Sequence, residues 1–286
     1  MTLLTPNHKW EEELLSVKNV SLKLGNGNKQ KLILRDINVT VRNLVQPGGP
    51  TRGQVIGFLG PSGRGKTQLL RVLAGLQKPT TGEVKVRFGD QMVPVDPGQV
   101  GVVSQKYPLL RNRTVLGNLL LAAKMKGIGP AEAQHKALHL LEEFGLEDKT
   151  ENYPIELSGG QRQRVAIIQQ MLCSDFYWLF DEPVSGLDPI AKNKACRMIR
   201  AVADMDERNT VVFVTHDVRS AVAISDMIWL LGFEHHPETG DPIPGSIIRE
   251  TYNLVQMGLA WHPELMQTRE FSDFCNELEY VKFRDL

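Results

Sequence analysis

The chain contains short apolar runs rich in β-branched residues, separated by stretches with helical periodicity. Four of these runs are residues 55–59, 100–104, 176–180 and 211–215. Near-continuous apolar runs are typical of strands that are buried on both faces, as in a parallel sheet covered by helices. Residues 14–41 differ, because two apolar stretches flank the polar segment GNGNKQ, which predicts an antiparallel hairpin. The pattern therefore predicts an α/β fold with a mostly parallel sheet and an N-terminal antiparallel β subdomain.

Three helical patterns interrupt the strands, and Gly and Pro residues separate them. They predict a helical subdomain inserted at about residues 106–172. After residue 232 the chain changes to a turn-rich loop, one further strand, and a partly helical segment over 256–286. We therefore expect a core domain over residues 1–232 and a C-terminal extension over 233–286.

Composition narrows the class of protein. Hydrophobic residues make up 42% and charged residues 23%, as in soluble globular proteins. The 33 basic residues balance the 33 acidic ones, which argues against a chain that holds nucleic acid through bulk positive charge. No apolar run approaches the ~18–20 residues of a transmembrane helix, and residues 1–15 do not form a signal peptide. The cysteines, Cys173, Cys196 and Cys275, suit a reducing compartment and match no zinc pattern.

A glycine-rich segment between a predicted strand and a predicted helix matches the phosphate-loop pattern G-x-x-x-x-G-K-[ST]. Its glycines let backbone N–H groups curl around an anion, and the helix N-terminus adds partial positive charge. We expect Lys66 to reach the β- and γ-phosphates and the Thr67 hydroxyl to bind Mg²⁺. A glycine turn that matches by chance is the alternative, and the strand and helix on either side disfavour it. The expected nucleotide-binding residues are Gly60, Pro61, Ser62, Gly63, Arg64, Gly65, Lys66, Thr67 and Gln68.

Two carboxylates, Asp181 and Glu182, follow the apolar run at 176–180. Ligands of parallel sheets bind at the carboxyl ends of the strands. We expect Asp181 to hold Mg²⁺ and Glu182 to polarise the attacking water. An acidic turn at a strand end is the alternative, but the phosphate loop earlier in the chain favours the catalytic interpretation.

Further motifs follow in a specific order. Gln105 comes after the strand at 100–104, LSGGQ occupies 157–161, SGLD occupies 185–188, and His216 ends VVFVTH. With the phosphate loop and the Asp-Glu pair, this order resembles the nucleotide-binding subunit of ABC transporters over residues 14–232. The resemblance implies a P-loop NTPase core, an antiparallel β subdomain and an inserted helical subdomain.

The resemblance also implies that two subunits pack head to tail around two Mg-ATP, so each site is completed by a second ATPase subunit, either an identical copy or a paralogue. LSGGQ also has a structural interpretation, because Ser158 and Gln161 are spaced as a capping box. The same residues can cap the helix and contact the nucleotide. The residues expected to contact the nucleotide of the second subunit are Ser158, Gly159, Gly160, Gln161 and Asp188.

Roles in catalysis follow from the same resemblance. Gln105 joins the metal and the water to the helical subdomain, and His216 contacts the γ-phosphate and orients the water. Asp188 links the two sites across the dimer. The implied catalytic set is Glu182, His216, Gln105 and Lys66, and the implied metal ligands are Thr67, Gln105 and Asp181.

The sequence departs from the family pattern near the base of the nucleotide. Leu24 occupies the position where the family stacks an aromatic ring on adenine, and such stacking is worth roughly 1–3 kcal/mol. We therefore expect weaker contact with the base. Gln68 stands where Ser or Thr is usual. Residues 41–54 form a longer link, which we expect to be an extra loop.

A chain without a membrane span implies that separate permease subunits form the transport path, as in importers. We expect them to dock on the stretch from Tyr107 to Leu116 and on the helical subdomain, with the protein in the cytoplasm on the inner face of the cell membrane. The C-terminal extension, with TREFSDFCNELE, resembles the nitrate/sulfonate/taurine importer group.

Two other function classes are weighed against import. ABC ATPases that act on nucleic acid or ribosomes usually carry coiled coils, zinc modules or a second cassette, and this sequence has none of them. We therefore expect no nucleic-acid partner. A nucleotide sensor that does not hydrolyse ATP is disfavoured by the presence of Lys66, Asp181, Glu182 and His216.

Overall fold

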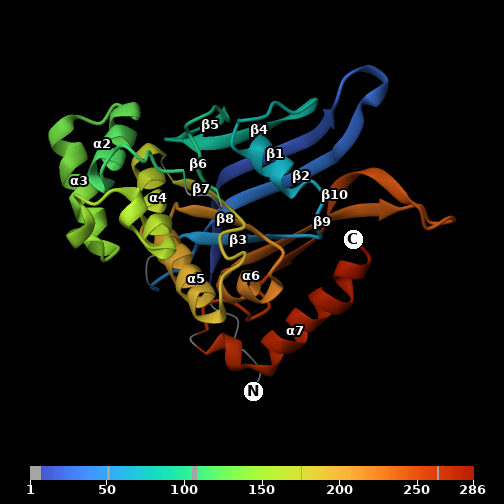
Figure 1. Ribbon diagram of the computed structural model, residues 1–286. Helices are drawn as coiled ribbons and strands as arrows, with labels where there is room; N and C mark the ends of the chain where they lie inside the picture. Colours follow the sequence, from blue (N-terminus) through green and yellow to red (C-terminus); the bar gives the residue numbers. More distant parts are fainter. Residues whose placement is uncertain (1–7, 50–51, 105–107, 175, 263) are drawn as a thin grey trace.

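The computed structural model describes residues 8–49, 52–104, 108–174, 176–262 and 264–286. Ten strands in this part of the chain form a single mixed sheet (Figure 1). Their order across the sheet is β5-β4-β1-β2-β10-β9-β3-β8-β7-β6. The strands are β1 (Lys9–Leu24), β2 (Lys31–Val45), β3 (Gln54–Leu59), β4 (Thr81–Phe88), β5 (Gln91–Pro94), β6 (Gly101–Ser104), β7 (Tyr177–Asp181), β8 (Thr210–Thr215), β9 (Met227–His235) and β10 (Pro242–Asn253).

The helices of the described residues lie beside and on both faces of this sheet. The α-helices are α1 (Lys66–Leu73), α2 (Val115–Met125), α3 (Pro130–Glu143), α4 (Gly159–Cys173), α5 (Pro189–Asp204), α6 (Val218–Ile224) and α7 (Arg269–Tyr280). Short 3₁₀ turns are η1 (Gly27–Lys29), η2 (Glu147–Lys149), η3 (Pro154–Glu156), η4 (Leu265–Gln267) and η5 (Lys282–Arg284).

The α/β prediction is confirmed, and the four apolar runs are β3, β6, β7 and β8. These strands pair in parallel with one another, and β9 is parallel to β3 but antiparallel to β10. Every residue of β3 and β8 is buried. Burial on both faces explains why the runs are apolar throughout. β1 and β2 form the predicted antiparallel hairpin, which β4 and β5 extend.

The predicted extra loop over residues 41–54 is wrong for its first residues. β2 continues through Val45, since Val41 and Leu44 are buried and pair with Leu15 and Trp10 of β1. The second half of the segment leads to β3, which begins at Gln54. The prediction underestimated how far the buried face of the hairpin continues.

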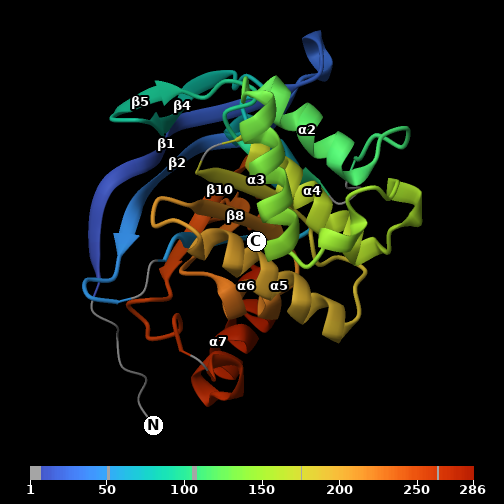
Figure 2. The ribbon, with the colours of Figure 1, turned by 90° about the vertical axis from the view of Figure 1, so that its left-hand side faces the viewer.

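Two apolar layers cover the sheet. Alternate residues of β3 and β8, such as Ile56 and Val212, pack with α1 and the antiparallel strands. The residues between them, such as Val55 and Phe213, pack with α5, α6 and α7. A third cluster joins α2, α3 and α4, which stand together at one side of the sheet, away from α7 (Figures 1 and 2).

The chain after residue 232 is built into this sheet. β9 passes through Gly232 and β10 pairs with β9 along its length. α7 is amphipathic, with Phe271, Phe274, Cys275 and Leu278 buried against the α5–α6 layer. The boundary at residue 232 stays a prediction of domain organisation.

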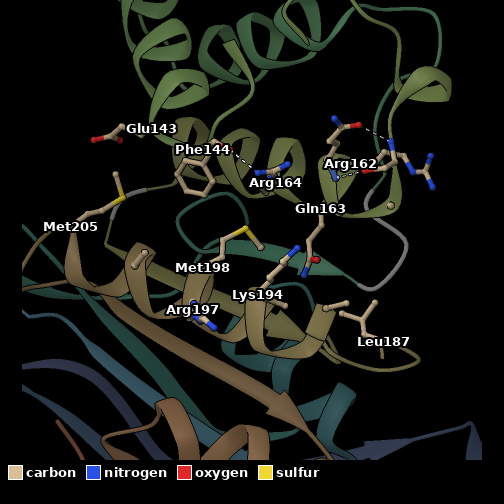
Figure 3. A pocket seen from close by; sticks show the side chains of 17 residues that line it. Glu143, Phe144, Arg162, Gln163, Arg164, Leu187, Lys194, Arg197, Met198 and Met205 are labelled. Carbon is tan, nitrogen blue, oxygen red and sulfur yellow. Dashed lines mark hydrogen bonds between the residues drawn. The ribbon is translucent and has the colours of Figure 1, made fainter. Parts of the chain in front are cut away.

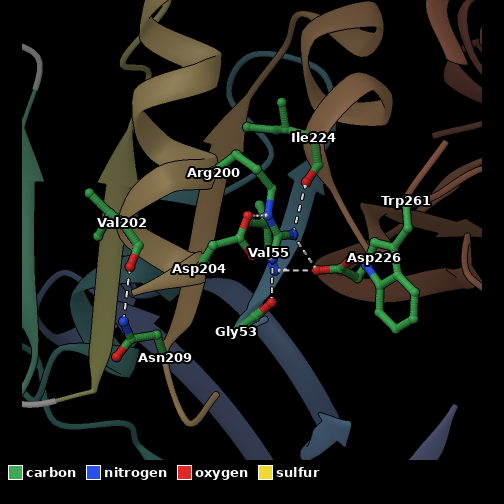
Figure 4. A network of polar contacts seen from close by, with 9 residues as sticks. All are labelled: Gly53, Val55, Arg200, Val202, Asp204, Asn209, Ile224, Asp226 and Trp261. Carbon is green, nitrogen blue, oxygen red and sulfur yellow. Dashed lines mark hydrogen bonds and ion pairs between the residues drawn. The ribbon is translucent and has the colours of Figure 1, made fainter. Parts of the chain in front are cut away.

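A buried polar network ties this C-terminal part to the sheet (Figure 4). The carboxylate of Asp226 accepts hydrogen bonds from Val55 N and Arg200 Nη1, both at 2.7 Å, and from Trp261 Nε1 at 2.6 Å. Arg200 of α5 also binds Asp204 at 2.6 Å. The network therefore joins β3, α5, the start of β9 and the segment before α7. No helix among the described residues is long and apolar enough to cross a membrane.

Candidate nucleotide-binding site

The phosphate loop lies where the pattern predicts it, between β3 and α1. Gly63 and Gly65 have φ values of 79° and 88°, a left-handed backbone that side chains other than glycine rarely adopt. Gly65 is also crowded, because a Cβ there would lie 3.1 Å from Cγ2 of Ile33. These two glycines turn the chain so that α1 begins at Lys66 with its first N–H groups at the loop.

Lys66 lies across this loop. Its ammonium donates hydrogen bonds to the carbonyl oxygens of Gly60 at 2.7 Å and Pro61 at 3.2 Å, and the residue is buried. Burial lowers the pKa of Lys66, while the nearby carboxylates of Glu182 and Asp181 act in the opposite direction. A cation held at the phosphate loop is placed to pair with a phosphate oxygen.

The two carboxylates lie at the carboxyl end of β7. Burial raises the pKa of Asp181, the neighbouring charge of Glu182 raises it further, and Lys66 lowers it. Glu182 has a φ of 51°, uncommon for a residue with a side chain, and its N–H donates to Val214 O at 2.9 Å. This strained turn directs the Glu182 side chain toward the end of β8.

His216 and Glu182 meet in the structure. Nδ1 of His216 lies 3.1 Å and 3.0 Å from the two carboxylate oxygens of Glu182. Thr215 Oγ1 donates to Oε2 of Glu182 at 3.2 Å and accepts from the N–H of Asp217 at 3.1 Å. The carboxylate is thus held by two groups from the end of β8.

Thr215 was missed from the sequence. Its position as the last residue of a buried strand, directly before His216, could have indicated it.

The donor set fits Mg²⁺. Thr67 lies in the first turn of α1 and Asp181 at the end of β7, and both offer the hard oxygen atoms that Mg²⁺ prefers. The raised pKa of Asp181 reflects a half-buried carboxylate beside a second one, and a cation at that point would relieve both effects. Gln105, the third predicted ligand, lies outside the described residues.

The LSGGQ segment begins α4 with the predicted capping box. Ser158 Oγ accepts from Gln161 N at 3.2 Å, and Gln161 Oε1 accepts from Ser158 N at 2.8 Å. Gly159 and Gly160 are exposed, and a Cβ at either position would meet no atom within 4 Å. Nothing described in this chain requires glycine there, although glycine costs up to ~1 kcal/mol in a helix. The predicted contact of both glycines with the nucleotide of a second subunit stays a prediction.

Two further predicted residues lie at element ends. Asp188 caps α5 by accepting hydrogen bonds from Ile190 N at 2.9 Å and Ala191 N at 3.0 Å, and these bonds lower its pKa. Leu24 ends β1 and packs against the apolar layer on the α1 side of the sheet. Their contacts with a nucleotide stay predictions.

The sequence did not predict a contact of Arg64. Its guanidinium lies 4.3 Å from the ring centroid of Phe233, so the phosphate loop touches the end of β9. A guanidinium over an aromatic face is attractive.

The predicted permease surface is described only in part. Tyr107 lies outside the described residues. Leu109 and Leu116 pack against the α2–α4 cluster, whereas Leu110 is exposed. Buried Asn118 orders the loop by accepting from Leu110 N at 2.8 Å and donating to Leu110 O at 3.1 Å.

Comparisons with known proteins agree with this geometry. A family model described as ABC transporter matches residues 50–185. A sulfate/thiosulfate import ATP-binding protein of Brucella melitensis is 39% identical over 197 residues, covering 66% of this chain and 54% of the relative. An Fe(3+) ions import ATP-binding protein of Rhizobium etli is 37% identical over 193 residues, which also cover 66% of this chain and 54% of the relative. A methionine import ATP-binding protein of Rhodococcus jostii is 29% identical over 252 residues, covering 86% and 71%.

The chain spans about half the length of the first of these relatives. A solved dimeric ATP-binding cassette in a post-hydrolysis state with ADP and Pi superimposes with a TM-score of 0.63 at 25% identity, covering 84% of this chain and 99% of that one. The phosphate loop at the end of β3, the carboxylates at the end of β7, the LSGGQ cap of α4 and these matches together place the chain in the ABC transporter family, as an ATP-binding domain.

Proposed function

We propose that the chain is the ATP-hydrolysing subunit of an ABC importer, which dimerises head to tail around two Mg-ATP and drives separate membrane subunits. The observation that carries the proposal is the Glu182 carboxylate, which His216 and Thr215 hold at the carboxyl end of the sheet, where the phosphate loop also lies. A held carboxylate beside a phosphate loop is suited to polarise water for attack on a γ-phosphate.

Each group of this chain then has one task. The loop N–H groups and Lys66 would bind the β- and γ-phosphates, and Thr67 and Asp181 would hold Mg²⁺, which would supply positive charge to the phosphate oxygens. Glu182 accepts a proton from the water, and His216 keeps Glu182 and the water in place. Product release then opens the dimer.

The LSGGQ end of α4 would supply the second subunit's contact. The open surface at Gly159 and Gly160 lets a phosphate approach the backbone at a helix N-terminus, where N–H groups and the helix dipole favour an anion. Ser158 and Gln161 keep that terminus ordered, and Asp188 would contact the same interface. We place the permease contact on residues 107–116 and on the α2–α4 cluster, at the inner face of the cell membrane.

The experiment compares the size-exclusion mass of the Glu182→Gln protein with and without Mg-ATP. The amide cannot accept the proton, so ATP stays bound and the mass should shift from monomer to dimer. Glu142→Gln, an exposed residue of α3, is the matched control and should hydrolyse ATP at the wild-type rate. A nucleotide titration on the same sample separates failure of dimerisation from failure of binding. Wild-type hydrolysis by Glu182→Gln would contradict the assigned role.

A further inference from the structure

A long groove runs between α5 and the wall formed by the ends of α3 and α4 (Figure 3). Its volume is about 1160 Å³, larger than the ~300–1,000 Å³ typical of small-molecule sites. Leu187 and Arg162 lie toward one end, and Glu143 and Met205 lie toward the other (Figure 3). α5 has 16 residues and is therefore about 24 Å long. The Met205 end is therefore about a helix length away from Leu187 and the start of α5.

The groove face of α5 carries a regular pattern. Small or apolar residues, with one lysine among them, recur at alternating spacings of four and three, which is the spacing by which one helix packs on another. The opposite face of α5 is buried against the sheet and α6. The stripe consists of Ala191, Lys194, Met198 and Ala201 on α5, with Leu187 just before the helix and Met205 at its C-cap.

The stripe is open to a partner. Ala201 and Met205 are exposed, and Met198 is half-buried. Phe144 lines the facing wall, so apolar groups lie on both sides of the groove (Figure 3). Methionine side chains adapt to the shape of a partner helix.

Charge indicates what kind of helix would fit. The lining side chains include four cations and one carboxylate, Glu143. The cations are Arg162 and Arg164 on the α4 wall and Lys194 and Arg197 on α5. Arg162 donates to Leu157 O at 2.6 Å and Arg164 to Phe144 O at 3.0 Å, and because both acceptors are uncharged, the groove lining keeps an excess of positive charge.

We propose that this groove binds an acidic amphipathic helix of a partner protein. Its apolar face would lie on Met198, Ala201 and Phe144, and its carboxylates would pair with Lys194 and Arg197. A second copy of α5 is a poorer occupant, because it would bring the same cations against each other. The proposal concerns the nucleotide-free chain and does not rest on ATP binding.

The test uses a fluorescein-labelled 18-residue helical peptide with Leu at alternating spacings of three and four and Glu at the flanking positions. Fluorescence anisotropy measures its binding to the nucleotide-free full chain. We expect at least tenfold tighter binding than for the same peptide with Lys in place of Glu. Hydrogen exchange should slow over residues 159–164 and 189–204 when the peptide is bound.

Variants locate the site. Arg197→Glu and Ala201→Glu both change exposed positions and should weaken binding at least tenfold, with the melting temperature checked for each. Arg71→Glu, an exposed arginine of α1 on the other face of the sheet, is the control and should leave binding unchanged. Equal binding of both peptides, equal effects of Arg71→Glu and Arg197→Glu, or protection elsewhere would overturn the proposal. Nucleotide-free self-association that Ala201→Glu removes would assign the groove to a second copy instead.

Discussion

At the residue scale, the site depends on how one carboxylate is held. Glu182 and His216 are 34 positions apart and meet because β7 and β8 run parallel in a register that pairs Asp181 with Val214. The residues that follow this pair, Glu182 and Thr215, are therefore neighbours. Thr215 Oγ1 donates to Glu182 while it accepts from the N–H of Asp217, so one buried hydroxyl connects the carboxylate to the start of α6.

The Thr215→Val substitution should affect ATP hydrolysis, which needs a well-placed Glu182 carboxylate, but not nucleotide binding. A hydrogen bond to a charged group is worth ~1.5–3 kcal/mol, so its loss should slow ATP hydrolysis by roughly ten- to a hundredfold. Nucleotide affinity should not change, because Thr215 does not belong to the phosphate loop. Steady-state rates and a nucleotide titration measure the two quantities. Thr210→Val, at the other end of β8 and equally buried, is the control and should keep the rate.

Asp181 makes the stability of the nucleotide-free protein depend on pH. Its pKa is raised by burial and by Glu182, so the folded state holds the proton more tightly than the unfolded state. Because the folded state binds this proton more tightly, protonation of Asp181 stabilises the fold at low pH. That stabilisation is lost as the pH rises from the unfolded-state pKa of about 3.9 through the higher folded-state pKa. Asp181→Asn should therefore raise the melting temperature by a few degrees at pH 7, with a smaller gain near pH 4.

Added Mg-ATP tests whether the same carboxylate binds the metal. It should stabilise the wild type much more than Asp181→Asn, because the amide is a poor Mg²⁺ ligand. Thermal melts from pH 4 to pH 8, with and without Mg-ATP, give both comparisons. A melting-temperature difference that stays constant across this pH range would contradict the raised pKa.

At the element scale, α4 shows a capping pattern and a functional motif on the same residues. The hydrogen bonds between Ser158 and Gln161 are those that any S-x-x-Q helix start makes. The two exposed glycines that follow are not explained by the cap, and they support an approach from outside the chain. Stability and dimer formation should therefore respond differently to changes at Ser158.

Two substitutions at Ser158 separate these roles. Ser158→Ala removes the cap and should cost about 1 kcal/mol of unfolding free energy. Ser158→Asp keeps a good cap, so its stability should match the wild type, but its charge would repel the γ-phosphate of the second subunit. In the Glu182→Gln background, only Ser158→Asp should abolish the ATP-dependent mass shift while leaving urea unfolding unchanged. A dimer that forms normally with Ser158→Asp would remove this segment from the interface.

Elements marked by a continuous apolar run or a strict sequence motif could be predicted from the sequence. β3 and β8 are apolar apart from Gln54, Thr210 and Thr215 because both faces are buried, and α1 follows a phosphate loop whose pattern is strict. The position of β10 could not be predicted, because its residues are mostly only partly buried and its ladder with β2 has one residue pair, Ser246 with Leu34. The site residues could be chosen by motif, whereas the contact of Glu182 with Thr215 required the register of β7 and β8. The α5 groove could not be predicted either, because it depends on how α3, α4 and α5 are placed around it.

At the scale of the whole molecule, the nucleotide site and the polar network lie at opposite ends of β3. The phosphate loop follows Leu59, while Asp226 binds Val55 near the beginning of the strand. Trp261 joins the network from the segment that leads to α7, with a φ of 61° and Arg52 5.5 Å from its ring. The indole hydrogen bond to Asp226 holds this strained residue, so the network fastens the C-terminal part to the core without touching the site.

Trp261→Phe should therefore weaken the fold but not the chemistry. Phenylalanine keeps the aromatic packing, yet Asp226 Oδ1 loses its donor inside the protein, which costs about 1–3 kcal/mol. Urea unfolding should show this loss, and hydrogen exchange should speed up first in α7. Nucleotide affinity should stay at the wild-type value. Trp10→Phe, which alters a partly buried tryptophan packed on the same apolar cluster, is the control for lost ring area. An equal loss of stability in both variants would mean that ring area, and not the bond to Asp226, fastens the C-terminal part.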